Sequence, residues 1–144
     1  MRCVTGGCVG EAQLDLFERL LQQLDLYAST VTREELELDF DTWLKVSRAL
    51  ELAAQCAVDL AMRVVAKRGL GLPESYRETF GRLSSAGVIT TEDAKQLAAW
   101  AGLRNLLAHM YASIDLDRLY AALQEDKAVL RRIGQTAAAE LLAE

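Results

Sequence analysis

The sequence lacks the features that mark several classes of protein. It has one proline, aromatic residues make up only 6% of it, and no run of apolar residues is long enough to span a membrane. Combined with a hydrophobic content of 51%, so little proline and so few aromatics are unlike the composition of a disordered or an all-β protein. The N-terminal segment has no signal-peptide core. These absences predict a soluble, cytoplasmic protein without membrane contact.

The charge balance excludes one further class of protein. The chain carries 16 lysines and arginines against 21 aspartates and glutamates, a formal net charge of −5. A protein that binds nucleic acid without specificity has a broad basic field, which this composition does not provide. We therefore expect no DNA partner, and we expect any contact with RNA to depend on a few local cations.

Cysteine is scarce as well, and its spacing favours neither disulfides nor metal sites. Cys3, Cys8 and Cys56 cannot all pair within one chain, and no CxxC or Cys/His ligand spacing joins them. A reducing compartment suits such cysteines, and we expect neither a metal nor another cofactor. Residues 1–11, which include Cys3 and Cys8, are interpreted as a loosely held tail; a disulfide or metal role for this pair is the less favoured alternative.

The composition that remains is typical of a helical domain. Hydrophobic residues make up 51% of the 144 positions and charged residues 26%, which suits one globular domain with a sizeable core. Apolar residues recur at steps of three and four. We predict an all-α fold over residues 12–144, an antiparallel bundle of four main helices and one short helix. The predicted helices cover residues 12–28, 40–68, 76–83 and 116–142, with a further helix that begins at residue 92, and residues 30–38 are interpreted as a polar connection.

The helix over residues 40–68 carries the strongest pattern. Asp39 precedes it as an N-cap, and Gly69, Gly71 and Pro73 follow it as a stop signal. Apolar residues occupy nearly all of its circumference apart from one polar stripe. This helix is therefore expected to pack on several neighbours, with a second protomer among the candidates.

The single histidine of the chain, His109, lies in a distinctive setting. Arg104 precedes it by five positions and Tyr111 follows it by two. Histidine is the only side-chain type whose ordinary pKa lies near neutrality, so it can take a proton from a ribose 2′-hydroxyl or give one to a leaving 5′-oxygen without a metal. Arginine is a permanent, planar partner for a phosphate, and a tyrosine hydroxyl can orient the phosphate or the imidazole. These residues predict cleavage of RNA through a cyclic phosphate.

Helix geometry restricts how these side chains can meet. At about 100° per residue, Arg104 and Tyr111 share a face of a helix, whereas His109 lies about 140° from Arg104. Either the helix ends near Ala108 and swings His109 back, or the groups meet across the axis of a dimer. Acid and base catalysis needs two titrating groups, and each chain has one histidine. A symmetric dimer that contributes two copies of His109 is the economical arrangement.

The spacing of Arg104, His109 and Tyr111 resembles the Arg-x4-His-x-Tyr motif of HepT-like HEPN proteins. Three further segments are similar to that family. They are residues 48–51 of the long helix, the stretch of residues 72–80 with its Pro-Glu-Ser-Tyr core, and the lead-in to the motif at residues 102–105. The resemblance extends from about residue 12 to the C-terminus.

This resemblance implies a dimeric, metal-independent endoribonuclease that acts as the toxin of a type II toxin–antitoxin pair. It implies that Arg104 and His109 are catalytic residues in a cleft between two protomers. The implied partners are an RNA substrate, either tRNA or mRNA, and a minimal nucleotidyltransferase as the antitoxin. Tyr111 is implied either to position RNA or to receive AMP from the antitoxin, and an adenylyl group would add bulk and negative charge beside the RNA phosphate.

Four polar residues are candidates for supporting this site: Asn105, Gln55, Asp59 and Arg63. Asn105 follows Arg104 directly, and the other three lie on the polar stripe of the 40–68 helix. Related sequences often carry an acidic residue where this chain has Gln55. Gln55 can still donate a hydrogen bond but cannot act as a base, so an acidic role there falls to Asp59. The simpler interpretation of the stripe is a solvated or ion-paired face.

Two other functions compete with the nuclease. A non-catalytic HEPN-like bundle can act as the substrate-binding partner of a nucleotidyltransferase, which the intact set of Arg104, His109 and Tyr111 disfavours. A helical scaffold or dimerisation protein explains the apolar helices but gives no reason for the motif. RNA cleavage that persists in a chelator and is lost in His109→Ala separates the nuclease from both.

Overall fold

The computed structural model describes residues 6–109 and 111–142, and all of the secondary structure in these residues is helical. The predicted all-α fold is thereby confirmed. The helices are α1 (Gly6–Thr30), α2 (Arg33–Leu38), α3 (Phe40–Arg68), α4 (Tyr76–Ser85), α5 (Thr91–His109), α6 (Leu116–Gln124) and α7 (Ala128–Leu141), with a 3₁₀ turn, η1 (Tyr111–Ser113), between α5 and α6.

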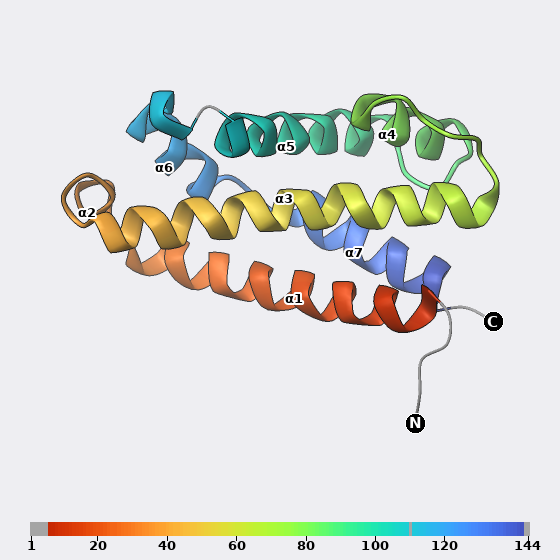
Figure 1. The fold of residues 1–144 in the computed structure, drawn as a ribbon, viewed down its shortest axis with the longest axis horizontal. Helices are drawn as coiled ribbons and strands as arrows, with labels where there is room; N and C mark the ends of the chain where they lie inside the picture. The colour runs from red at the N-terminus through yellow and green to blue at the C-terminus, as the bar shows by residue number, and fades with distance from the viewer. Residues whose placement is uncertain (1–5, 110, 143–144) are drawn as a thin grey trace.

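The central helix of the bundle is α3. Figure 1 shows α1 and α7 along one side of it and α4 and α5 along the other, and α1 and α5 run opposite to α3 and α7. Asp39 caps the start of α3 by accepting a hydrogen bond from the backbone N–H of Asp41, and Gly69 follows its end in the left-handed conformation, with φ of 65°. Both ends of α3 therefore lie where the sequence predicts them.

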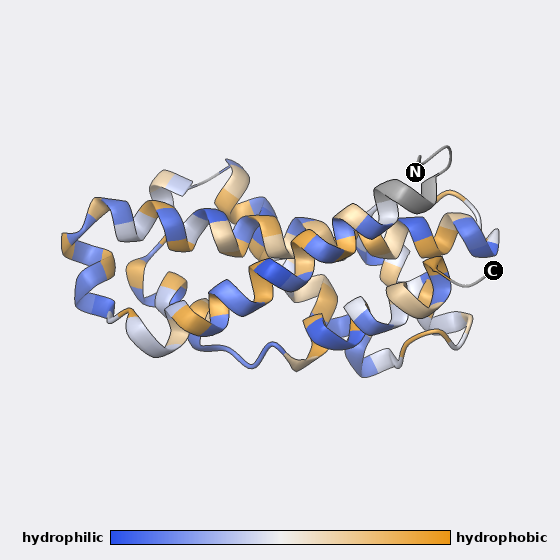
Figure 2. Ribbon diagram, turned by 90° about the horizontal axis from the view of Figure 1, so that it is seen from below, coloured by the Kyte–Doolittle hydropathy of each residue, from blue (hydrophilic) through white to orange (hydrophobic). Residues whose placement is uncertain are grey.

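One hydrophobic core joins the helices α1 to α7. Each helix contributes at least one large buried side chain, and burying a side chain of this size contributes roughly 1.5–3 kcal/mol. Examples in chain order are Phe17, Leu36, Leu50, Phe80, Leu97, Leu119 and Ile133. Hydrophobic and hydrophilic residues alternate along the helices, as expected of amphipathic helices around a shared core (Figure 2). Within the described residues, no helix has the length and apolar character needed to cross a membrane.

Residues 33–38 form α2 and not the polar connection that the sequence predicts. Thr32 and Glu35 form a capping box at its start, in which the N–H of Glu35 donates to Thr32 Oγ1 (3.1 Å) and the N–H of Thr32 donates to Glu35 Oε1 (2.9 Å). Leu36 is buried and anchors the helix to the core. Six residues are too few to show a helical period of apolar positions, which is why periodicity missed α2.

The single helix predicted over residues 116–142 is wrong, because this segment forms two helices, α6 and α7. At the break, the ammonium group of the buried Lys127 donates to the backbone carbonyls of Leu123 (2.5 Å) and Glu125 (3.1 Å). The carboxylate of Asp126 accepts a hydrogen bond from the backbone N–H two residues later (2.9 Å). These side chains replace the helical hydrogen bonds between α6 and α7. No proline or glycine marks the break, so turn signals did not reveal it.

At the N-terminal end, α1 begins at Gly6, six residues before the start that apolar periodicity predicts. The predicted tail, residues 1–11, thus overlaps the first turns of α1, and its residues 1–5 lie outside the described residues. Cys3 is one of those residues, and the side chain of Cys8 is likewise not described. Cys56 is a free, buried thiol on α3.

Candidate active site at the end of α5

The helix α5 carries three of the predicted site residues, Arg104, Asn105 and His109. The side chain of Thr90 caps the start of α5, and the helix packs on α3, α4 and α7. The side chains that attach it to the core are Leu97, Trp100, Ala101, Leu103 and Leu107. This buried face fixes the rotation of α5 about its axis, and thereby leaves Arg104 and Asn105 half-buried at the margin of the core.

His109 and Tyr111 lie at the exposed end of this helix. His109 is the last residue of α5, and Tyr111, which is 58% exposed, follows in η1; Met110 between them lies outside the described residues. Because α5 remains helical through His109, it does not turn this residue back at Ala108. Helical geometry then holds Arg104 and His109 about 140° apart, so one chain alone does not bring both side chains onto one face.

The guanidinium group of Arg104 lacks hydrogen-bond partners within the described residues. Its Nε is fully buried and has no hydrogen-bond partner among residues 6–109 and 111–142. Its two terminal nitrogens also have no partner in the described residues, but they are not among the fully buried atoms, so they reach solvent. A buried N–H without an acceptor costs about 1–3 kcal/mol. The arrangement thus directs a permanent cation, with one unsatisfied donor, toward the surface of the molecule.

The side chains next to Arg104 at this end of α5 also lack hydrogen-bond partners within the described residues. Within residues 6–109 and 111–142, no hydrogen bond or ion pair engages the side chains of Asn105, His109 or Tyr111. Imidazole, amide and phenol groups can all donate to or accept from a phosphate or a ribose hydroxyl. The end of α5 therefore presents several polar groups that are free to bind a ligand from outside the chain.

The predicted supporting residues Gln55, Asp59 and Arg63 lie together, but they face α1. Gln55 Nε2 donates to Asp59 Oδ1 (2.8 Å), Gln13 Nε2 of α1 donates to Asp59 Oδ2 (3.4 Å), and Arg63 Nε donates to Gln13 Oε1 (2.7 Å). This half-buried network ties α1 to α3. None of its hydrogen bonds reaches a motif residue of α5. Sequence patterns missed Gln13, because its role depends on how two distant helices pack.

A cysteine nucleophile is not an alternative centre for this site. Burial, and to a smaller degree the charge of Asp59, raises the pKa of the Cys56 thiol to about 11. The reactive thiolate is therefore scarce near neutral pH. Nor does the described part of the chain contain a group of three or more His, Cys, Asp or Glu side chains that could hold a metal ion.

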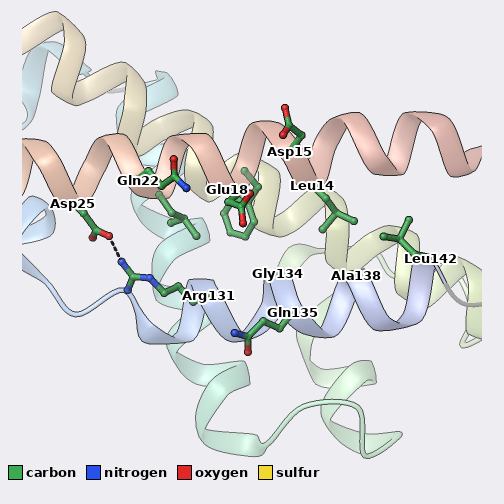
Figure 3. Close-up of a pocket in the computed structure, with 12 residues that line it drawn as sticks. Leu14, Asp15, Glu18, Gln22, Asp25, Arg131, Gly134, Gln135, Ala138 and Leu142 are labelled. Carbon is green, nitrogen blue, oxygen red and sulfur yellow. Dashed lines mark hydrogen bonds and ion pairs between the residues drawn. The ribbon is translucent and has the colours of Figure 1, made fainter.

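A groove of about 440 Å³ lies between α1 and α7, away from these residues (Figure 3). Its floor is apolar, and the carboxylates of Asp15, Glu18 and Asp25 are part of its lining. Arg131, the cation in the lining, is ion-paired with Asp25. Uncompensated carboxylates repel an RNA phosphate, and no motif residue lines the groove. The groove is therefore not the candidate site.

Two sequence comparisons identify relatives of this chain. A family model described as Ribonuclease HepT-like matches residues 17–137. A tRNA nuclease HepT of Aphanizomenon flos-aquae (strain 2012/KM1/D3) is 31% identical over 113 residues, which cover 78% of this chain and 76% of that protein. An mRNA nuclease HepT of Shewanella oneidensis is 30% identical over 79 residues, which cover 55% of this chain and 59% of that protein.

A structural comparison supports the same assignment of fold. The rebuilt and re-refined structure of a tri-AMPylated Shewanella oneidensis HEPN toxin in complex with MNT antitoxin matches with a TM-score of 0.80 and 21% identity, over 92% of this chain and 98% of that one. At this level of identity the match shows the shared helical fold. Together with the family model and the relative that is 31% identical, it leads to one conclusion. The chain belongs to the HepT-like family of ribonucleases.

Proposed function

We propose that this ribonuclease is a metal-independent endoribonuclease toxin whose active site forms between two protomers. The observation that carries the proposal is the state of the groups at the end of α5. Within the described residues, Arg104 has a buried Nε without a hydrogen-bond partner, and the exposed side chain of the single histidine, His109, has no partner either. An arginine and a histidine left open in this way suit a phosphodiester that is bound and cleaved.

The chemistry needs two titrating groups. A base removes the proton of the 2′-hydroxyl, the 2′-oxygen attacks phosphorus, the bond to the 5′-oxygen breaks, and an acid gives that oxygen a proton. The products are a 2′,3′-cyclic phosphate and a free 5′-hydroxyl. In the proposed dimer, the two copies of His109 act as base and acid, and Arg104 stabilises the negative charge that builds up on the phosphate.

The geometry of α5 is the reason for a dimer. Within one chain, Arg104 and His109 diverge around the helix axis. A two-fold axis beside the end of α5 places His109 of one protomer opposite the motif of its partner, which supplies both histidines to one groove. The free amide of Asn105 and the exposed hydroxyl of Tyr111 would line the same groove and hold the RNA, either tRNA or mRNA. Gln55, Asp59 and Arg63 support this groove indirectly, because their hydrogen bonds hold α1 on α3.

The proposed regulator is a minimal nucleotidyltransferase antitoxin that transfers AMP from ATP to the Tyr111 oxygen and releases pyrophosphate. The proposal is supported by the exposure of Tyr111, a residue that is 58% exposed and lies on a short turn that follows His109 closely in the chain. An adenylyl group there would bring negative charge next to the imidazole and exclude the RNA phosphate.

The decisive experiment measures cleavage of labelled RNA in EDTA by the wild type, His109→Ala and Arg118→Ala. Arg118 is an exposed arginine of α6 and serves as the control. We expect His109→Ala to lose at least about 100-fold in kcat and Arg118→Ala to stay near the wild type. Equal cleavage by His109→Ala and the wild type contradicts the proposal. Binding of RNA by both without cleavage supports the binding-module alternative.

Mixing experiments test the shared site. Wild type is mixed with His109→Ala, and the subunits are allowed to exchange. If the site needs both imidazoles, the remaining activity is proportional to the square of the wild-type fraction. If the site is complete within each protomer, the remaining activity is proportional to the wild-type fraction itself. A proportional decline contradicts the composite site but leaves the nuclease activity itself intact.

A further inference from the structure

The stretch of residues 72–80 is the part of the sequence pattern to which the proposed reaction assigns no role. Most of its side chains have a structural one. Ser75 caps α4 by accepting a hydrogen bond from the N–H of Glu78 (3.0 Å), and Glu78 forms an ion pair with Arg82. Arg82 also donates to a backbone carbonyl of the loop before α4 (2.7 Å). The hydroxyl of Tyr76 has no such role.

Tyr76 begins α4 and lies against α5. Its side chain is half-buried and packs on the core. Its Oη is 3.9 Å from the position that a Cβ atom on Gly102 would occupy. This oxygen has no hydrogen-bond partner in the described residues, and it is not among their fully buried unpaired atoms, so it keeps some access to solvent. Because Gly102 has no side chain, no side chain from this position of α5 covers the hydroxyl.

The hydroxyl lies on the same face of α5 as the histidine. Gly102, Asn105 and His109 follow one another at steps of three and four residues and so share one face. The seven residue steps from Gly102 to His109 correspond to about 10.5 Å along the helix axis. Tyr76 is therefore too far from the imidazole to touch the reacting atoms, but it lies along the path of a strand that passes over His109 and Asn105.

We propose that the Tyr76 hydroxyl and the Asn105 amide form a subsite for RNA, which binds the phosphate of a nucleotide next to the cleaved bond. The inference rests on the proposed nuclease function and extends it to residues outside the motif. Proteins commonly hold single-stranded RNA by hydrogen bonds and aromatic side chains beside the reacting group. Arg77 is an exposed cation in the first turn of α4, without a partner in the described residues, and it favours a phosphate at this end of the helix.

The test is Tyr76→Phe, which removes the hydroxyl and keeps the ring. Two substrates are compared, a dinucleotide whose only phosphate is the one cleaved and an oligonucleotide with the same cleavage step. On the oligonucleotide we expect KM to rise about tenfold with kcat unchanged, as for the loss of one hydrogen bond to a charged group. On the dinucleotide, we expect no change. Tyr27→Phe, at another half-buried tyrosine on α1, is the matched control.

Two outcomes overturn the inference. The first is that Tyr76→Phe leaves the KM for the oligonucleotide unchanged. The second is that Tyr76→Phe reduces kcat/KM equally on both substrates, which would indicate a structural role of the hydroxyl. Binding of a 2′-O-methyl oligonucleotide, measured by fluorescence anisotropy, separates the subsite from catalysis. Weaker binding by Tyr76→Phe supports the subsite even if the wild type fails to cleave RNA, a failure that counts against the proposed function alone.

Discussion

Replacing Arg104 by methionine should stabilise the free protein, against the usual effect of removing an arginine. In the part of the chain that the structure describes, the Nε of Arg104 is buried without a hydrogen-bond partner, and a methionine side chain occupies a similar space without this donor. Arg63 offers a matched control. It is also a half-buried arginine within a helix, but its Nε donates to Gln13 Oε1 at 2.7 Å. The same substitution therefore removes an unsatisfied donor at one position and a satisfied one at the other.

The two substitutions should differ in sign. A buried donor without an acceptor costs about 1–3 kcal/mol, and the lower end applies to Arg104 because its side chain is only half-buried. Removing it should raise the free energy of unfolding by about 1 kcal/mol. Arg63→Met should lower that free energy by about 1 kcal/mol, the net contribution of one hydrogen bond. Arginine and methionine have similar helix propensities, so propensity does not obscure this difference.

Urea unfolding, followed by circular dichroism, measures both variants against the wild type. The expected separation between them is about 2 kcal/mol, with Arg104→Met above the wild type and Arg63→Met below it. Equal losses of stability in the two variants would refute the reasoning, because they would require that the Arg104 Nε–H has a partner in the folded protein. A loss that grows with protein concentration would place that partner in a second protomer.

Three further predictions concern stability. Burial raises the pKa of Cys56 to about 11, so the folded protein loses this proton at a higher pH than the unfolded chain does. Relative to Cys56→Ala, the wild type should therefore lose about 1 kcal/mol of stability between about pH 8 and pH 10, as measured by urea unfolding. Burial lowers the pKa of Lys127, so the unfolded chain binds this proton more tightly than the folded protein does. Relative to Lys127→Met, the stability of the wild type should therefore rise as the pH approaches 10.5. A difference in stability between the two proteins that does not change with pH would contradict this. Gly81→Ala should raise the Tm, because the added Cβ meets open space in α4. Gly134→Ala should raise the Tm less or lower it, because its Cβ would lie 3.3 Å from the ring of the buried Phe17. Equal shifts in Tm for the two variants would contradict this packing argument.

The sequence predicted those parts of the fold that depend on local signals. The bounds of α3 follow from Asp39 and Gly69, whose capping conformations need only their neighbours in the chain. The all-α class follows from apolar periodicity. In the site, the spacing of Arg104 and His109 along the chain is enough to determine their angular separation on α5, because a regular helix fixes it.

The parts that were missed depend on contacts between distant segments. The break before α7 arises because Lys127 is buried and turns its ammonium group onto nearby carbonyls, and burial is decided by the surrounding helices. The pairing of Gln13 with Arg63 and the approach of Tyr76 to Gly102 also join helices far apart in the chain. Neither periodicity nor capping carries information on which faces of two helices meet.

The distribution of ion pairs bears on how a chain with a net charge of −5 would hold RNA in the proposed function. Among the described residues, the arginines that form ion pairs with carboxylates are Arg33, Arg48, Arg68, Arg82, Arg131 and Arg132. A paired arginine adds little to the field at a distance, because its charge is cancelled nearby and screened by salt. Arg77 and Arg104 are among the arginines that form no such pair in the described residues, as are Arg19, Arg63 and Arg118. In the proposed dimer, each protomer brings its own Arg104 and Arg77 to one groove, so the association that supplies the second imidazole also supplies the local positive charge that the single chain lacks.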